Sequence, residues 1–266
     1  MSKTKIDWCD EVANIFTGCT GTCSYCYARP MARRIAAIPS RPGLPYRRVA
    51  EKTGDSFHPA FHGDVCDKLS WRLERARSPK RIFVGSMGDM CFDGEAVGYN
   101  IDSKETEQYK TADVQREVSI FARKLERSGH TILLLTKRPE LLIDADWPAN
   151  VHMGASVTGN SDSARVNTLL AMSDGFALKW VSVEPLLDSK FNTKNLIGMD
   201  WVVVGAQTGS TSAERTTEER EELRETASRI VDFCSANSTP VFIKDNLAKL
   251  APDRKWPRQL PERKIQ

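Results

Sequence analysis

Seven short apolar, β-rich segments recur along this 266-residue chain, separated by segments of helical periodicity. They span residues 14–17, 82–86, 131–136, 152–157, 178–183, 201–205 and 240–244. Most are continuous apolar runs such as Ile-Leu-Leu-Leu or Trp-Val-Val-Val, typical of strands buried on both faces of a parallel sheet. Helix-spaced apolar residues lie between them, at 114–125 and 223–234. The alternation predicts an α/β fold whose parallel sheet is either doubly wound or curled as a barrel.

The periodicity fades after residue 244, and three later prolines indicate an extended segment. We therefore expect one domain over residues 1–245 and a basic, Pro-containing C-terminal tail over residues 246–266. No uncharged apolar run approaches the roughly 20 residues that cross a bilayer, and the N-terminus lacks the apolar stretch of a signal peptide. These features predict a cytoplasmic protein without membrane contact, whose seven cysteines are thiols or metal ligands.

The net charge of +3, from 38 basic and 35 acidic residues, neither demands nor excludes nucleic acid. The distribution is more informative, because residues 28–50 hold six arginines and no acid. This stretch is either a footprint for an anionic ligand or a solvated surface.

Polar residues follow most of the apolar segments, and parallel α/β folds place their chemistry where strands end. The set comprises Ser86, Met87, Asp89, Lys137, Arg138, Ser156, Glu184 and Lys244. Their convergence predicts a ligand site at one edge of the sheet. The alternative, that each caps a helix or satisfies a loop, suits Ser156 better than Lys137 or Glu184.

Three thiols lie close together in Cys19-Thr-Gly-Thr-Cys23-Ser-Tyr-Cys26. Three thiolates within eight residues can hold one soft metal centre. A structural zinc site normally takes two pairs of ligands, and the other four cysteines are scattered. Three ligands on a four-iron cluster leave one iron open to a small molecule, and Tyr25 supplies an aromatic wall. Zinc and unligated cysteines remain the alternatives.

This spacing, with an aromatic residue before the third cysteine, resembles the signature of the radical S-adenosylmethionine (radical SAM) superfamily. The segments Ile-Phe-Val-Gly-Ser-Met-Gly-Asp (82–89), Leu-Leu-Thr-Lys-Arg-Pro (134–139) and Val-Glu-Pro-Leu-Leu (183–187) are similar to its phage-associated three-Cys-motif branch. Two segments depart from that branch: Gly-Ala-Gln-Thr-Gly (205–209) lacks its acid, and Val-Phe-Ile-Lys-Asp-Asn (241–246) lacks its Gln and Trp. The departures bear on the substrate rather than on the cofactor.

The resemblance implies a partial parallel (β/α)6 barrel of radical SAM type with an extra C-terminal strand or tail. It implies a [4Fe-4S] cluster on Cys19, Cys23 and Cys26, with S-adenosylmethionine chelating the unique iron. One electron, from a donor such as flavodoxin, then cleaves S-adenosylmethionine to methionine and a 5′-deoxyadenosyl radical that abstracts a substrate hydrogen.

The resemblance also suggests roles for the strand-end residues. Ser86, Met87 and Asp89 occupy the place where the methionyl amine is bound, and Ser156 the place for the ribose. Either Lys137 or Arg138 would neutralise the methionyl carboxylate or a substrate phosphate. Tyr25 and Glu184 complete the expected cofactor-binding set. The alternative for Lys137 and Arg138 is a structural ion pair with Glu184.

Two further residues are expected on the substrate side. Lys244 would face the substrate. Cys91 would donate a hydrogen atom, as a thiol does in spore photoproduct lyases of this superfamily, although a single cysteine near a strand end is more often inert.

The sequence thus predicts a radical SAM enzyme that rearranges or modifies a nucleobase, such as an isomerase in thymidine hypermodification of phage DNA. Its partner would be DNA or a nucleotide-derived substrate. One alternative is an iron–sulfur nucleic-acid-binding or repair-associated protein without turnover of S-adenosylmethionine. Another is a zinc-stabilised binding protein.

Overall fold

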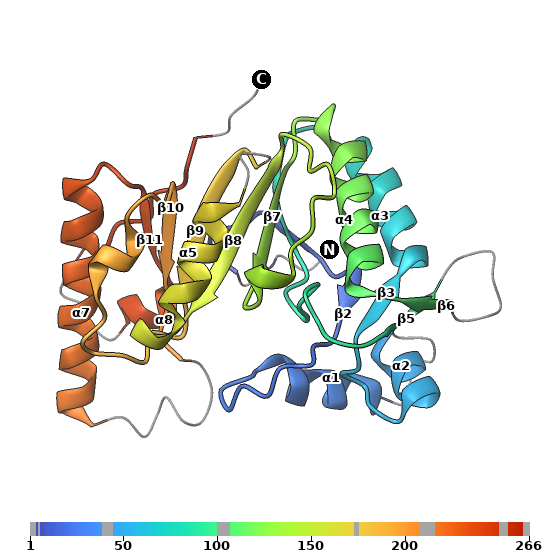
Figure 1. Ribbon diagram of the computed structural model, residues 1–266, viewed down its shortest axis with the longest axis horizontal. Coiled ribbons are helices and arrows are strands. Elements are labelled where there is room, and N and C mark those ends of the chain that lie inside the picture. The colour runs from blue at the N-terminus through green and yellow to red at the C-terminus, as the bar shows by residue number, and fades with distance from the viewer. Residues whose placement is uncertain are drawn as a thin grey trace.

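The computed structural model describes residues 4, 6–38, 45–99, 107–172, 176–207, 216–249 and 255–262. Its main sheet has seven parallel strands paired in chain order: β1 (Glu11–Ala13), β4 (Arg81–Val84), β7 (Thr131–Thr136), β8 (Val151–Val157), β9 (Leu178–Val183), β10 (Trp201–Val204) and β11 (Val241–Ile243). The strand order never reverses, and the sheet curls into a half-barrel (Figure 1). The α/β class is confirmed and the doubly wound alternative is wrong, because a doubly wound sheet reverses its order.

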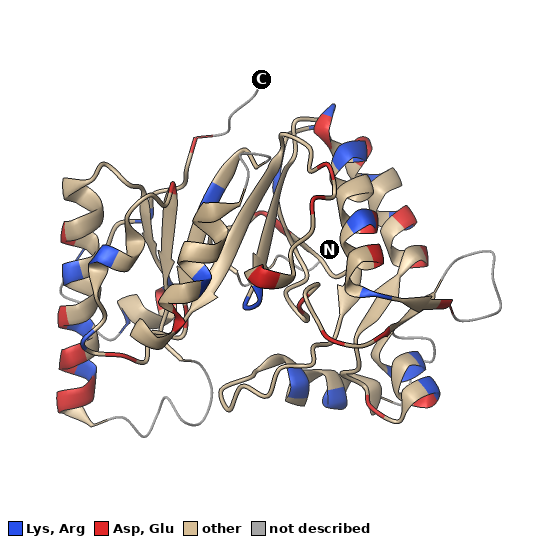
Figure 2. Cartoon of the chain, in the orientation of Figure 1, with Lys and Arg blue, Asp and Glu red and all other residues tan. Residues whose placement is uncertain are grey.

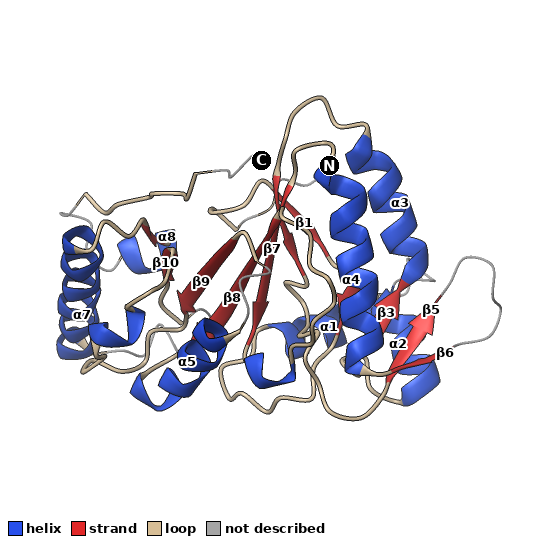
Figure 3. Ribbon diagram, turned by 45° about the horizontal axis from the view of Figure 1, so that its top comes forward, coloured by secondary structure: helices blue, strands red, loops and turns tan. Residues whose placement is uncertain are grey.

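Helices cover the outer face of this sheet (Figure 3). They are α3 (Gly63–Glu74), α4 (Thr111–Glu126), α5 (Ser163–Ala171) and α7 (Thr217–Ala236). The predicted helix faces over residues 114–125 and 223–234 are buried on α4 and α7. The connections from β7 to β8 and from β9 to β10 hold only 3-10 turns, η1 (Pro139–Leu141) and η3 (Thr193–Leu196), so a count of six β/α units is not confirmed.

Side chains along β9 alternate between the outer helices and the concave interior. Val181 and Val183 belong to the core packed against the helices, whereas Trp180 joins an interior aromatic cluster with Trp8 and Trp201. The Trp8 ring lies 5.3 Å from Trp180 and 5.9 Å from Trp201, centroid to centroid. These three tryptophans give the interior an apolar floor.

A second, four-stranded sheet was not predicted. It consists of β2 (Phe16–Thr17), β3 (Ala60–His62), β5 (Ala96–Tyr99) and β6 (Glu107–Tyr109), with α1 (Ala28–Ala36) and α2 (Pro45–Thr53) beside it (Figure 1). The first predicted strand, over residues 14–17, is wrong as a strand of the main sheet: β1 ends at Ala13, and only Phe16 and Thr17 form a strand, β2, which belongs to the small sheet. Since β2 leads directly into the cysteine motif, the small sheet sets where that motif begins.

The C-terminal segment packs onto the barrel where it is described. After α8 (Asp245–Ala248), Trp256 is buried in the core beneath β10 and β11, and the Trp201 indole N–H donates to the Gln259 carbonyl at 3.0 Å. Parts of the predicted tail, residues 250–254 and 263–266, lie outside the described residues. Within the described part of the chain, no helix has the length and apolar character needed to span a membrane.

Candidate functional site

A cavity of about 1240 Å³ lies inside the half-barrel. It reaches from Asp10 and Lys80, beside the amino ends of β1 and β4, to the residues at the carboxyl ends of the strands. Nearly all the predicted site residues line it: Cys19, Cys23, Tyr25, Cys26, Ser86, Met87, Asp89, Lys137, Ser156, Glu184 and Lys244. Arg138 and Cys91 are not among the lining residues. The expected convergence of strand-end residues is thus present, with two exceptions.

The cysteine loop is fixed to the end of β4 by backbone pairing. The Gly18 N–H donates to the Met87 carbonyl, and the Asp89 N–H donates to the Gly18 carbonyl, both at 3.0 Å. Gly18 has a φ of +83°, and a Cβ there would lie 2.2 Å from the His58 carbonyl oxygen. Only glycine fits this turn, which directs the chain from β2 into the cavity at Cys19.

Each of the three sulfurs has a nitrogen neighbour. Backbone N–H groups of Gly21 and Arg29 donate to Cys19 Sγ at 3.2 Å and to Cys26 Sγ at 3.4 Å. Lys137 Nζ lies 3.5 Å from Cys23 Sγ. Hydrogen bonds of this kind stabilise thiolate sulfur.

The space between two of the sulfurs depends on a glycine. A Cβ at Gly21 would lie 3.2 Å from Cys19 Sγ and 4.0 Å from Cys23 Sγ.

Burial, and then the nearby Asp89 carboxylate, raises the pKa of Cys19 to about 11. Metal binding at this thiol would therefore displace a proton.

The donor set fits a thiolate-held cluster in type and number. All seven cysteines are free thiols, and Cys19, Cys23 and Cys26 reach the cavity, whereas Cys66 and Cys234 are buried in the core. Over the described residues, no three His, Cys, Asp or Glu side chains are already gathered as metal ligands. The three thiols thus share one loop and one cavity, but their sulfurs are not arranged as ligands of a single metal ion.

Arg29, which was not predicted, braces the cysteine loop. Its guanidinium donates to the carbonyls of Cys19 and Gly21, both at 3.2 Å, and pairs with Asp55 at 3.3 Å. It also stacks over Phe57 at 4.9 Å. Since its own N–H reaches Cys26, Arg29 contacts both ends of the motif. Its position three residues after the last cysteine is the sequence feature that could have identified Arg29 as part of the site.

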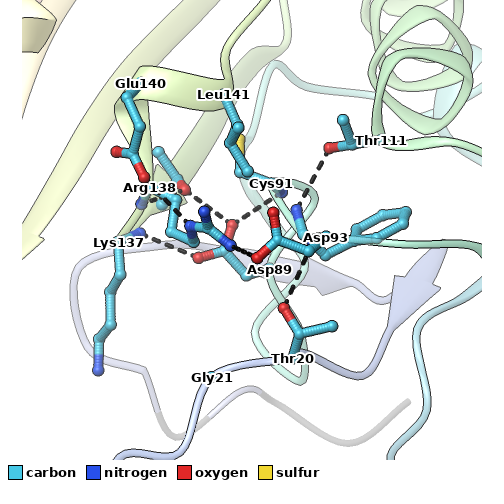
Figure 4. Close-up of polar contacts among 12 residues, drawn as sticks. Thr20, Gly21, Asp89, Cys91, Asp93, Thr111, Lys137, Arg138, Glu140 and Leu141 are labelled. Carbon is cyan, nitrogen blue, oxygen red and sulfur yellow. Dashed lines mark hydrogen bonds and ion pairs between the residues drawn. The ribbon is translucent and has the colours of Figure 1, made fainter.

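Asp89 is a buried carboxylate that joins the ends of β4 and β7 (Figure 4). It accepts from the Thr136 hydroxyl at 2.8 Å, from the Lys137 N–H at 2.9 Å and from the Cys91 N–H at 3.0 Å. Burial raises the pKa of this carboxyl, although the three donors act in the opposite direction. The Cys91 contact is the local one expected of a capping residue, and the contacts to β7 add a long-range role.

Lys137 and Arg138 diverge from this anchor (Figure 4). Lys137 Nζ points to the cysteine loop, where it lies 3.1 Å from the Tyr25 hydroxyl. Burial alone would lower the pKa of Lys137, but its contacts with Tyr25 and Cys23 outweigh burial and raise it. Arg138 instead pairs with Asp93 and with Glu140 on the outside.

Glu184 pairs with Lys244 across the far side of the cavity, so the alternative in which it pairs with Lys137 or Arg138 is wrong. The two side chains come from the ends of β9 and β11, which flank the end of β10. Ser156 Oγ donates to the Glu184 carbonyl at 3.4 Å. Ser182, another lining residue that was not predicted, is 1% exposed, and its Oγ has no hydrogen-bond partner among the described residues.

Tyr27 and Asn14 also line the cavity and were not predicted. The Tyr27 hydroxyl donates to the Ser86 carbonyl, and Ser86 Oγ donates to Asn14 Oδ1 at 3.1 Å. The position of Tyr27 directly after the third cysteine was the signal that could have identified it.

Cys91 is fully buried in the core rather than placed at the cavity, and its sulfur lies 3.8 Å from Gln115 Nε2. Burial raises the pKa of this thiol well above its ordinary value. Its proximity to Asp89 in sequence does not bring its side chain to the cavity, because the chain turns inward after Asp89.

The arginine-rich stretch is largely used within the protein. Arg29 braces the cysteine loop, Arg47 caps carbonyls at the end of α1 at 3.0 and 2.7 Å, and Arg48 pairs with Asp64 at 2.7 Å. Arg33 and Arg34 are exposed on α1, where Figure 2 shows basic residues on the outer surface. Arg41 lies outside the described residues. An anionic footprint on this stretch is thus reduced to two arginines in the described structure.

Comparison with known proteins gives a family for the chain. The family described as "Protein of unknown function (DUF5131)" has a model that matches residues 3–250. The chain belongs to this family. No curated protein matches the sequence.

Solved structures of spore photoproduct lyase are similar in fold. A mutant complexed with dinucleoside spore photoproduct has a TM-score of 0.52 at 11% identity, and a second mutant has 0.51 at 12%. A third, with bound AdoMet and the same dinucleoside, has 0.50 at 11%. Each match covers 91% of this chain and 78% of the other. The similarity is one of fold, shared with spore photoproduct lyase; the phage-associated branch is not confirmed.

Proposed function

We propose that this protein is a radical SAM enzyme whose cluster is held by Cys19, Cys23 and Cys26. The observation that carries the proposal is the placement of these three thiols on one loop that enters the cavity of a curled parallel sheet. When bound, a [4Fe-4S] cluster with S-adenosylmethionine supplies one-electron cleavage of the sulfonium, and with it a radical able to abstract hydrogen. An external donor such as flavodoxin would supply the electron.

The residues around the loop would hold and orient S-adenosylmethionine. Tyr25 and Met87 provide apolar walls, and Tyr27 holds the Ser86 carbonyl in place. Asp89 Oδ2 accepts one hydrogen bond from the Lys137 backbone and can accept another from an ammonium. Ser156 offers a hydroxyl for a ribose. Arg138 has no part in this set, because its guanidinium is held outside the cavity.

The far side of the cavity would receive the substrate. Lys244 and Glu184 present a donor and an acceptor side by side, and the buried Ser182 hydroxyl lacks a protein partner among the described residues. Leaving a buried hydroxyl unpaired costs about 1–3 kcal/mol, so a ligand that bonds to Ser182 would recover part of that cost. Polar groups over an apolar floor suit a flat heteroaromatic group, consistent with a nucleobase in thymidine hypermodification of phage DNA. Cys91 is given no catalytic role.

The test is anaerobic reconstitution followed by dithionite reduction in the presence of S-adenosylmethionine. We expect about four irons per chain and release of 5′-deoxyadenosine in the wild type. Cys19→Ala, Cys23→Ala and Cys26→Ala should each abolish release, whereas the matched core variants Cys66→Ala and Cys234→Ala should retain it. A colourless, zinc-loaded protein would overturn the proposal, and iron without cleavage would favour an iron–sulfur binding protein.

Nucleic-acid binding needs a separate test. Nucleoside mass spectrometry of phage DNA made with and without the protein should reveal a changed base. Duplex DNA should bind with an affinity that falls as salt rises, because phosphate contacts release counterions. An affinity independent of salt would exclude the polynucleotide and favour a small metabolite or peptide.

A further inference from the structure

Lys137 sends its ammonium group from the end of β7 across to the cysteine loop. Nζ lies 3.5 Å from Cys23 Sγ and 3.1 Å from the Tyr25 hydroxyl, and it sits 4.3 Å from the centroid of the Tyr25 ring. Lys137 forms no ion pair with a carboxylate in the described structure, and Glu184 is paired with Lys244 instead. Of the two groups that Nζ contacts, Cys23 Sγ is the one that would carry a negative charge as a cluster ligand.

The direction of this side chain is fixed at its backbone. The Lys137 N–H donates to Asp89 Oδ2 at 2.9 Å, and the Thr136 hydroxyl donates to Asp89 Oδ1 at 2.8 Å. Thr136 Oγ1 in turn accepts from the Arg138 N–H at 2.9 Å. Figure 4 shows Arg138 turned toward Asp93 and Lys137 extending in another direction. The network thus holds two adjacent cations so that Lys137 reaches Cys23 and Arg138 reaches Asp93.

We infer that Lys137 is a positioning residue that compensates negative charge at the Cys23 thiolate and so raises the reduction potential of the cluster. The inference rests on the proposed function, because it requires a cluster on this loop. One-electron reduction adds a negative charge to a thiolate-held centre, and a fixed cation in contact with one sulfur favours the reduced state. Hydrogen bonds to cluster sulfurs and net charge are the established determinants of such potentials.

The experiment is a redox titration of the reconstituted protein, followed by electron paramagnetic resonance, on four variants. Lys137→Gln removes the charge, Lys137→Met does so with an apolar chain, and Lys137→Arg keeps it. Arg138→Gln is the matched control, because it removes a neighbouring charge that points away from the loop. For both neutral Lys137 variants we expect the reduced-to-oxidised ratio at a given potential to fall at least tenfold, about 59 mV for one electron. The Lys137→Arg and Arg138→Gln variants should stay within about half of that shift.

The possible outcomes separate this inference from the proposed function. Unchanged potentials in Lys137→Gln and Lys137→Met, or an equal shift in Arg138→Gln, would overturn the inference and leave the cluster in place. Absence of a cluster from the wild type would overturn both. If the two neutral variants lose iron while Lys137→Arg retains it, cluster assembly itself needs the charge, which supports the inference. Loss of iron from all three Lys137 variants would assign the residue a purely structural role and overturn it.

Discussion

His62 makes the stability of the small sheet depend on pH. The ring is fully buried on β3 and lies between Arg48 Nη2, 2.7 Å from Nδ1, and Thr17 Oγ1, 2.8 Å from Nε2. Arginine can only donate, so Nδ1 accepts and the Nε2 proton is given to Thr17. Protonation would place a second donor against the Arg48 guanidinium. Burial and then the Arg48 charge lower the pKa of His62 from 6.5 to about 3, with Asp64 opposing.

The sign follows from the proton count. Between pH 6.5 and 3 the unfolded chain binds a proton at this histidine and the folded protein does not, so folding stability falls as pH falls. With those two pKa values, the loss from pH 7 to pH 5.5 is about 1.3 kcal/mol for this single group.

The assay is urea denaturation at pH 7 and at pH 5.5, on the wild type and on His62→Asn. The variant should be less stable at pH 7, because it loses packing and a hydrogen bond, and its free energy of unfolding should depend less on pH by about 1.3 kcal/mol over this interval. Equal pH dependence in the two proteins would refute a buried neutral imidazole at this position.

Three further predictions concern the cysteine loop, the far side of the cavity and the C-terminal segment. Arg29→Met should lower the free energy of unfolding by about 2 kcal/mol, because charge-assisted hydrogen bonds are lost, and it should speed the loss of iron. The control Arg33→Met, at an exposed position on the same helix, should change neither quantity. Similar iron loss from both variants would contradict the bracing role. Gly205→Ala should lower the free energy of unfolding by roughly 1–3 kcal/mol, because its Cβ would lie 2.9 Å from Glu184 Cδ. Thermal denaturation measures this loss, and a variant as stable as the wild type would disprove this packing. Trp256→Ala should lower the free energy of unfolding, measured with denaturant, by about 3–5 kcal/mol, because Trp256 is part of the core. A loss under about 1 kcal/mol would contradict a core role for the segment after residue 254.

Much of the main sheet could be predicted from the sequence, because strands buried on both faces carry continuous apolar runs. β7 and β9 have the predicted bounds, and β4, β8, β10 and β11 differ by one or two residues at an end. Only β1 was missed, because it ends before the predicted segment 14–17 begins. The small sheet could not be predicted from such runs: β3 has only three residues, and β6 is Glu-Gln-Tyr, a polar edge strand. Its stability comes from long-range contacts such as His62 with Thr17, which leave no local pattern.

The candidate site was predicted where residue type and strand end coincide, as for Asp89 and Lys137. Pairings were harder to predict, because a cation can reach several carboxylates and only the fold decides between them. Glu184 pairs with Lys244, 60 residues away in the sequence. Neither residue's local motif indicates that their strands lie on either side of β10. Cys91 illustrates the converse error, since nearness in sequence to a site residue does not determine which way a side chain points.

The central claim is that three thiolates hold a cluster with one iron left open to a small molecule. The most direct measurement is Mössbauer spectroscopy of the reconstituted protein, enriched in iron-57, before and after addition of S-adenosylmethionine. We expect one iron site in four to change its isomer shift on addition, while the other three stay the same. A spectrum that S-adenosylmethionine leaves unaltered, with every iron already fully ligated by the protein, would contradict the account.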